Sequence, residues 1–491
     1  MNFRVLSTLL GLLIGILAFF LLIFTLVAFF FYSSEYQAGA FFESFLTTLV
    51  SAIILILWGG KVSEENVTFR EGFAVVGLGW IVIAFFGALP FYFSGDIPSF
   101  TDAYFESMSG YTTTGSSILS SVENLGHTVL LWRSFSHWLG GMGFIVLSLA
   151  ILPALGVGGM QLYKAEVPGP SPDKLMPRVG QTARILYMVY SLLTILQFSL
   201  LWAGGMNIFE SLCHTFGTMG TGGFSPLNGS IGQYTTTANS SALYFEVVII
   251  VFMFIAGANF SLHYRAMKGD WKVYFADSEF RFYFILVLLA IFTISLDLYN
   301  SSLYDDFGEV VRHSSFSVVS IITTTGYGTE NFDLWPNYSR FLLVFLMFIG
   351  GMAGSTGGGI KVLRIMTIMK EAIYEISHII HPKKVYSIRF GKTYIHRDVL
   401  SSMNMYVIVF LILYVLGILI LSTTGYDFET VSTMVVACFA NIGPGLGRVG
   451  PTENYGFLPD YAKWVLSYLM VLGRLELFPL LVLSLPGIWT K

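Results

Sequence analysis

Apolar runs long enough to cross a lipid bilayer recur along the whole chain, and this feature restricts it to a membrane protein built from helices. A membrane-spanning helix needs about 20 predominantly apolar residues. Charged residues occupy 11% of the 491 positions, whereas a soluble domain carries about 25%, and the mean hydropathy is +0.71. Because backbone polar groups must be paired within lipid, such runs predict α-helices. The predicted spans cover approximately residues 9–31, 42–59, 72–93, 128–153, 183–204, 243–262, 282–299, 339–360, 399–422 and 463–485, which makes ten spans.

The positively charged residues are divided unequally between the two sides of these spans. With Arg4 in the cytoplasm, twenty Lys and Arg residues fall on the inner side and five on the outer side. Cytoplasmic loops carry the excess of Lys and Arg. We therefore predict a multi-pass protein of the bacterial cytoplasmic membrane with both termini in the cytoplasm. The first run is followed by no small-residue cleavage site, so it is predicted to be a retained helix and not a signal peptide.

The sequence gives little support for an enzyme, a metalloprotein or a nucleic-acid binder. Cys213 and Cys438 lie far apart in apolar stretches, and the eight histidines show no metal-binding spacing. The net charge of −4 is close to balance, which does not fit a nucleic-acid partner. A polytopic enzyme acting on lipid remains an alternative, but it would need acids or histidines that converge at membrane depth.

Four outer connections each contain a short apolar segment that ends in a glycine turn. Segments of about ten residues are too short to cross a bilayer, so each predicts a re-entrant half-helix. Aligned without gaps, they run over Tyr104–Gly115, Ser211–Gly222, Ser315–Gly326 and Ser432–Gly443, with the glycines 107, 104 and 117 residues apart. The repetition predicts an all-α fold with two extra N-terminal spans and four pseudo-symmetric repeats of span, pore loop and span around a central pore. The predicted units are 1–66, 67–165, 166–272, 273–385 and 386–491.

The physics of such a repeat favours cation binding. A half-helix that ends near mid-membrane presents the negative end of its dipole to the central axis. The following loop has unpaired carbonyls, which a membrane tolerates where they line a water-filled or ion-filled cavity, and glycine allows the backbone to approach closely. Four loops could form a ring of oxygens for a dehydrated cation. A single TTTG turn would instead favour an ordinary threonine-rich loop. Acidic residues in the outer connections would either form a solvated rim or concentrate cations at the mouth.

At these loops the chain resembles the Trk/Ktr/HKT potassium transporters, and most closely the TrkH-type membrane subunits. The resemblance covers nearly the whole chain and rests on TTTGSS (112–117), GTGGFS (220–225), TTTGYGT (323–329) and NIGPGLG (441–447). It implies a selectivity filter for the transported ion, K⁺, and Gly115 in the first loop suggests potassium over sodium. The residues implied are Thr113, Thr114 and Gly115; Gly220, Thr221 and Gly222; Thr324, Thr325 and Gly326; and Asn441, Ile442 and Gly443. The second and fourth loops depart from TTTG, so the ring need not be four-fold symmetric.

Two further features lie in the second spans of the third and fourth repeats. A glycine-rich stretch should break its helix, because each glycine costs about 1 kcal/mol relative to alanine; close helix packing is the alternative. Arg474 lies within an apolar span, where an arginine is costly and usually functional, although it could pair with Glu476 or cap a broken helix. The resemblance implies that the stretch obstructs and gates the pore and that Arg474 is an electrostatic barrier. The gating residues implied are Gly350, Gly351, Gly354, Ser355, Thr356, Gly357, Gly358, Gly359 and Arg474. Gly140, Gly141 and Gly257, at comparable positions in the first two repeats, are expected to allow close packing near the pore.

The resemblance also suggests partners and a function. Potassium uptake driven by the membrane potential is the predicted function, with obligate coupling to sodium or protons as the alternative and Glu476 as the nearest candidate acid for a second ion. A homodimer is implied, together with a cytoplasmic TrkA-type nucleotide-binding regulatory subunit. The basic segments 160–182, 263–281 and 361–398 would dock that subunit, although such runs are also the ordinary positive-inside signal.

Overall fold

The chain folds into an assembly of helices, described here from a computed structural model. The structure describes residues 1–33, 35–61, 68–143, 179–237, 239–381, 389–390, 393–394 and 397–489. The inner part of the predicted span 128–153, most of the segment 160–182 and residues 382–388 of the basic segment 361–398 lie outside these residues. So do the predicted unit boundaries at residues 66, 165 and 385.

The predicted all-α class is confirmed, with one small addition. Six helices are long and apolar enough to cross a membrane, and two bent helix pairs raise the possible number to eight in the described part of the chain. The count of ten is therefore not confirmed, because α5 and α16 are too short to qualify. The six are α1 (Phe3–Phe31), α2 (Gln37–Gly59), α3 (Phe69–Phe93), α8 (Val179–Ala203), α14 (Ser278–Asn300) and α18 (Arg397–Leu421). The addition is an antiparallel pair of two-residue strands, β1 (Arg389–Phe390) and β2 (Thr393–Tyr394).

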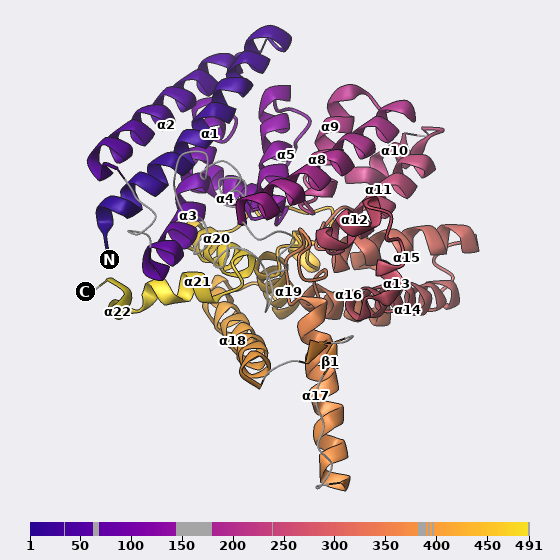
Figure 1. The fold of residues 1–491 in the computed structure, drawn as a ribbon. Coiled ribbons are helices and arrows are strands. Elements are labelled where there is room, and N and C mark those ends of the chain that lie inside the picture. The colour runs from indigo at the N-terminus through magenta and orange to yellow at the C-terminus, as the bar shows by residue number, and fades with distance from the viewer. Residues whose placement is uncertain are drawn as a thin grey trace.

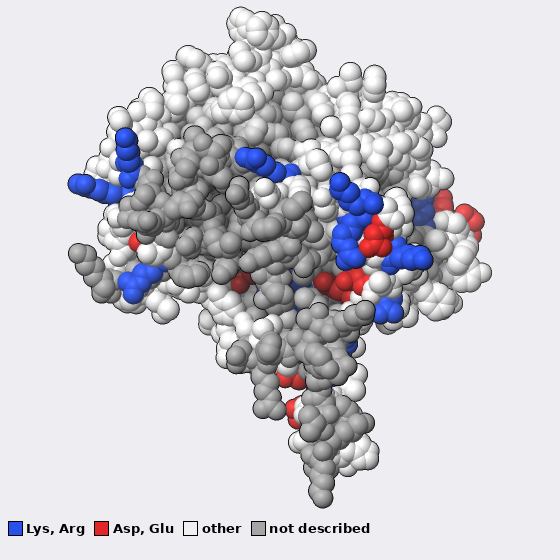
Figure 2. Space-filling model, viewed as in Figure 1, with Lys and Arg blue, Asp and Glu red and all other residues white. Residues whose placement is uncertain are grey.

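The outer surface of the long helices is apolar. Phe30 on α1, Leu57 on α2 and Leu419 on α18 are 71%, 77% and 62% exposed. Figure 2 shows the consequence on one face: its upper part, over α1, α2 and α9, is almost free of charged side chains. Exposed aromatic and aliphatic side chains in this density mark a surface in contact with lipid.

The chain repeats one helical sequence four times. A long helix leads into a half-helix of 12 or 16 residues, which is followed by a short helix of 12 to 15 residues. Figure 1 shows α1 and α2 side by side at one edge of the molecule, with α17 extending away from the body. The half-helices are α4 (Phe100–Tyr111), α9 (Ile208–Met219), α15 (Phe307–Ile322) and α19 (Phe428–Phe439). The short helices after them are α5 (His127–Gly141), α11 (Ala242–Ala256), α16 (Asn337–Phe348) and α20 (Asp460–Arg474).

The short helices α5, α11 and α20 end next to the last turn of a half-helix, and α11 and α20 are followed by sharp bends, whereas the sequence predicted a break only in the third repeat. After α11 the chain turns by 103° into α12 (Phe260–Met267), and after α20 by 119° into the segment that begins with α21 (Phe478–Leu481). The breaks lie at glycines that allow close packing: a Cβ on Gly140 or Gly473 would come within 3.0 Å of the last helical carbonyl of α4 or α19. The close packing expected at Gly140, Gly141 and Gly257 is thus observed. The remaining helices are α10 (Gln233–Thr236), α13 (Val273–Ala276), α17 (Val362–Ile380) and α22 (Pro486–Trp489).

The outer ends of the half-helices are capped and acidic. Ser99, Asn207 and Asp427 accept a hydrogen bond from a backbone N–H in the first turn of α4, α9 and α19. Each of the four half-helices carries an acid in its first turn, which complements the positive end of the helix dipole. The Thr430 N–H lowers the pKa of Asp427, so this carboxylate stays ionised at the outer surface. The outer acids thus have a structural role at the helix ends.

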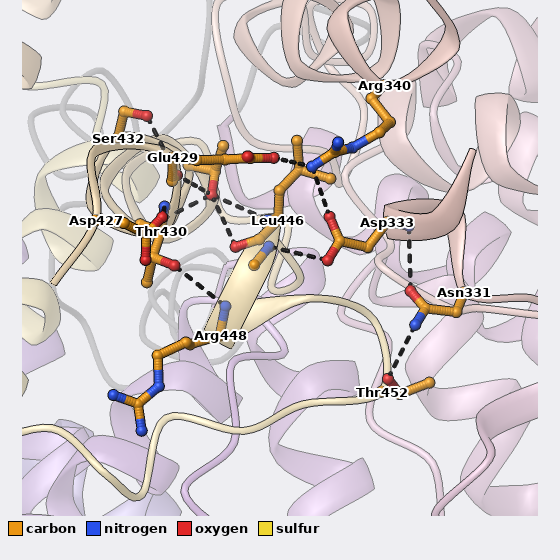
Figure 3. A network of polar contacts seen from close by, with 12 residues as sticks. Asn331, Asp333, Arg340, Asp427, Glu429, Thr430, Ser432, Leu446, Arg448 and Thr452 are labelled. Carbon is orange, nitrogen blue, oxygen red and sulfur yellow. Dashed lines mark hydrogen bonds and ion pairs between the residues drawn. The ribbon is translucent and has the colours of Figure 1, made fainter. Parts of the chain in front are cut away.

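Ion pairs fasten three of the four half-helices to the short helix of a neighbouring repeat. Lys463 on α20 bonds Asp102 on α4 at 2.5 Å, Glu246 on α11 bonds Arg312 on α15 at 2.5 Å, and Arg340 on α16 pairs with Glu429 on α19. Figure 3 shows the last of these, where Arg340 also reaches Asp333 at 3.0 Å. At the remaining contact, between α5 and α9, the ring of His127 lies 4.7 Å from that of Phe209.

Candidate functional site

The four half-helices end in the same backbone turn. The second residue after each helix has a positive φ: 55° at Thr113, 54° at Thr221, 59° at Thr324 and 57° at Asn441. L-residues rarely adopt this left-handed conformation. Its occurrence at one position of all four loops shows that they share one local structure.

The hydrogen bonds of these turns repeat as closely as the dihedral angles. The amide of each positive-φ residue donates to the carbonyl three residues back, as in Thr113 N to Gly110 O at 3.1 Å. The next amide donates to the carbonyl five residues back, a pattern known as the Schellman motif. The distances are 2.8 Å for Thr114 to Ser109, Gly222 to Gly217, Thr325 to Ser320 and Ile442 to Ala437.

This pattern corrects the alignment of the second loop by one residue. Counted from the end of the helix, Thr221 is equivalent to Thr113, and Gly223, not Gly222, is equivalent to Gly115. Gly223 has a positive φ of 79°, and Gly115, Gly326 and Gly443 likewise have positive φ values of 83°, 79° and 100°. The loop reads Gly220-Thr221-Gly222-Gly223, and an alignment by residue type cannot choose between adjacent glycines. Gly220 is the C-cap of α9 and matches Thr112.

The equivalent glycines pack the four loops against one another in a ring. A Cβ on Gly115 would come within 3.0 Å of the Gly222 carbonyl oxygen, and a Cβ on Gly223 would come within 3.0 Å of the Thr325 carbonyl oxygen. Gly326 approaches the carbonyl of Ile442, and Gly443 that of Thr114, in the same way. Each loop therefore contacts the next through the carbonyl of one equivalent residue: Thr114, Gly222, Thr325 and Ile442. The predicted loop residues come together, with the second loop shifted by one position.

The ring leaves oxygen atoms without protein partners. Thr113 Oγ1 and Asn441 Oδ1 are buried and have no hydrogen-bond partner among the described residues. On the outer side a cavity of about 140 Å³ is lined by Gly115, Gly223, Gly326 and Gly443 together with polar residues of the outer loops. Buried oxygens without donors can bind a cation whose hydration shell they replace.

The glycine-rich stretch after α16 is a non-helical loop beneath this ring. Its two ends are joined by Gly350 N to Ile360 O at 3.0 Å and Ile360 N to Phe348 O at 3.1 Å. Met352 N donates to Gly257 O at 2.9 Å, at the bend after α11. Gly358 N donates to Thr324 Oγ1 at 2.7 Å, so the glycine-rich loop touches the third loop of the ring directly. The predicted break of the helix is confirmed.

Arg474 joins this loop to the first and fourth repeats. Its Nη1 donates to Thr356 O at 2.6 Å, and its Nη2 donates to Gly140 O and Gly141 O at 2.5 and 2.6 Å. The last two carbonyls belong to the end of α5, so the capping of a broken helix, one of the two alternatives for this residue, is observed. A cavity of about 60 Å³ is lined by Gly141, Arg474 and the glycine-rich loop. The guanidinium thus contributes its charge below the ring.

Contacts of further charged side chains anchor the glycine-rich loop, and the sequence did not predict these contacts. Glu279 Oε1, in the first turn of α14, accepts hydrogen bonds from Ala353 N at 2.8 Å and Leu363 N at 3.1 Å. Lys361 Nζ donates to Gly357 O, and Arg364 pairs with Glu476. Arg364 also lies 3.8 Å from the ring centre of Tyr406. The one feature of the sequence that could have indicated Glu279 is the position of this acid at the start of an apolar span.

The resemblance implies that the glycine-rich loop obstructs an ion pathway; on that expectation, Gly358→Ala should raise cation flux by loosening the loop. A Cβ at this position would come within 3.0 Å of Ala440 O and of Asn441, so the glycine-rich loop must move away from the fourth loop of the ring. The loss of one hydrogen bond, from Gly358 to Thr324, predicts an increase of about fivefold. Ion flux into vesicles measures it. Gly39→Ala, which meets no atom within 4 Å, is the matched control; equal flux in both variants would contradict the expectation.

The fold and the ring define the class: an all-helical membrane protein whose four re-entrant half-helices bring backbone carbonyls together around one opening. The sequence model of the TrkH family, described as a cation transport protein, matches residues 40–487. The chain therefore belongs to the TrkH family.

Related proteins match this chain over their full length. The Trk system potassium uptake protein TrkH of Salmonella typhimurium and that of Escherichia coli K12 are each 38% identical over 495 residues, covering 100% of both chains. The crystal structure of the potassium transporter TrkH from Vibrio parahaemolyticus superposes with a TM-score of 0.88 at 34% identity, again covering 100% of each chain. These relatives are named as transport proteins.

Proposed function

We propose that this chain takes up potassium across the bacterial inner membrane through the ring of loops. The observation that carries the proposal is the four-fold repeat of the Schellman turn, which directs equivalent carbonyls toward neighbouring loops. Backbone carbonyls replace the hydration shell of K⁺ in potassium-selective pores. The potassium uptake named for the relatives supports the same ion.

The proposed selectivity filter follows the corrected register. It consists of Thr113, Thr114 and Gly115 in the first loop and Thr221, Gly222 and Gly223 in the second. Thr324, Thr325 and Gly326 complete the third loop, and Asn441, Ile442 and Gly443 the fourth. The side chains of Thr113 and Asn441, which are buried and have no described partner, would add oxygens at the inner end.

The proposed gate is the glycine-rich loop together with Arg474. Support comes from the contact of Gly358 with Thr324 and from the three carbonyls that Arg474 binds. Movement of the loop would break these contacts and open the space below the ring. Obligate coupling to sodium or protons is the less favoured function, because Glu476, the nearest candidate acid, pairs with Arg364.

The orientation and the partners belong to the same proposal. Both termini would lie in the cytoplasm, and the four repeats would follow the division 67–165, 166–272, 273–385 and 386–491 after two N-terminal spans. A homodimer that binds a cytoplasmic TrkA-type regulatory subunit would complete the system. The Trk-system names of the relatives and the exposed basic residues Lys268 and Lys272 support docking on this side.

Gly115→Ser tests the filter. Its Cβ would collide with the Gly222 carbonyl, and its φ of 83° disfavours any side chain. We expect the preference for potassium over sodium flux into proteoliposomes to fall by about tenfold or more, because an ion ring discriminates through the position of its oxygens.

Gly425→Ser is the matched control for this experiment. Gly425 has a nearly identical φ of 79°, but a Cβ there meets no atom within 4 Å. The control variant should keep the selectivity of the wild type. Potassium flux that is indifferent to Gly115→Ser would contradict the filter assignment.

A further inference from the structure

One carbonyl of the outer end of the ring differs from its three counterparts. The oxygen of Gly443 accepts a hydrogen bond from Tyr455 Oη at 2.7 Å and another from Ser116 Oγ at 3.3 Å. In the described part of the chain, the equivalent oxygens of Gly115, Gly223 and Gly326 accept no hydrogen bond. The Gly443 carbonyl of the fourth loop is therefore fixed by two hydrogen bonds that the equivalent carbonyls of the other three loops do not receive in the described part of the chain.

The tyrosine that holds this carbonyl is itself fixed. Tyr455 is 2% exposed, and its backbone N–H donates to Ser117 O at 2.7 Å. Ser117 Oγ donates to Glu106 at 2.9 Å, and Glu106 pairs with Arg133 at 2.6 Å. A buried ion pair thus anchors the segment that carries the tyrosine hydroxyl, so the hydroxyl cannot easily follow the carbonyl if that carbonyl turns toward an ion.

A carbonyl oxygen has two lone pairs, and Tyr455 and Ser116 occupy both. An oxygen engaged in this way is a poorer ligand for a cation than a free one. We propose that Tyr455 is a specificity-determining positioning residue that withdraws the Gly443 oxygen from the outermost ion site. That site then has three loop oxygens instead of four, and selection occurs mainly at the next ring, formed by the carbonyls of Thr114, Gly222, Thr325 and Ile442.

This inference rests on the proposed filter, and the test separates the two. Tyr455→Phe removes the closer donor and leaves the ring packing of the side chain in place. The freed oxygen strengthens the outermost site, so the apparent KM for external potassium falls by about fivefold, the equivalent of one hydrogen bond, while the maximal flux does not rise. The rubidium-to-potassium flux ratio shifts as well. Flux into proteoliposomes at graded external potassium and rubidium measures both.

The matched control is Tyr426→Phe. The Tyr426 hydroxyl donates to Phe457 O at 3.2 Å, a bond of the same kind to the segment that carries Tyr455, but its acceptor is not a carbonyl of the ring. An unchanged KM and an unchanged ion ratio in Tyr455→Phe, as in the control, would overturn the inference. If Gly115→Ser nevertheless loses selectivity in the same preparation, the proposed filter survives that result; if it does not, the filter itself fails.

A second variant keeps the test decisive if Tyr455→Phe does not fold. Ser116→Ala removes the longer of the two hydrogen bonds and should lower the KM in the same direction by a smaller factor. Where both single variants fold, the double variant should give the largest shift. A double variant with the wild-type KM would contradict a role for these two hydroxyls in the outer site.

Discussion

Arg474→Ala is expected to raise the maximal potassium flux by about tenfold or more. Two unit charges about 4 Å apart interact by about 4 kcal/mol at an effective dielectric constant of about 20, and a third of that energy is already a factor of about ten. The substitution also removes the hydrogen bonds to Thr356, Gly140 and Gly141. Flux into proteoliposomes, normalised to the amount of folded protein, measures the effect.

Arg474→Lys separates the charge from the hydrogen bonds. Lysine keeps the positive charge but cannot bind three carbonyls with the planar fork of arginine. If the charge is the barrier, the lysine variant should conduct like the wild type. If the hydrogen bonds to the three carbonyls form the barrier, the alanine and lysine variants should both have a raised flux of equal size. A wild-type flux in Arg474→Ala would show that this residue neither blocks nor gates the pore.

Glu106→Ala is expected to lower the stability of the protein by about 3–5 kcal/mol, because it leaves the charge of Arg133 buried without its partner. The side chains of Glu106 and Arg133 are 0% and 4% exposed. Glu106 also binds Ser117 Oγ and Ile118 N, so its loss frees the segment after the first loop of the ring. The midpoint of thermal unfolding in detergent should therefore drop strongly.

The more exposed ion pair between Glu429 and Arg340 provides the comparison. Glu429 is 45% exposed, and exposed pairs contribute only about 0–1 kcal/mol. Glu429→Ala should therefore shift the midpoint little. Equal shifts in the two variants would show that burial does not set the contribution of these pairs.

The repeating parts of this protein could be predicted from its sequence. Apolar length identified the long helices, because a bilayer demands about 20 residues from each of them. The spacing of Gly115, Gly326 and Gly443 identified three of the four loops in the correct register. The glycines from Gly350 to Gly359 identified the helix break, because so many of them in succession cannot sustain a helix.

The remaining features depend on contacts between distant segments. Gly222 and Gly223 are chemically identical, so only the hydrogen bonds of the turn distinguish them. The bends after α11 and α20 depend on neighbouring half-helices, and no run of glycines announces them. Glu279 binds the backbone of residues 74 and 84 positions away, and such a pairing leaves no local pattern. The partnership of Glu476 with Arg364 is equally invisible in the sequence.

The oxygens through which the four loops contact one another belong to the main chain. A point mutation can replace a side chain, but it cannot delete a peptide carbonyl. Mutations that change the ion preference must therefore act indirectly. They can replace the glycines that allow the loops to touch, or hydroxyl groups such as that of Tyr455 that donate a hydrogen bond to a carbonyl. Related chains that carry different ions should differ at such supporting positions, while the backbone that contacts the ion keeps the same shape.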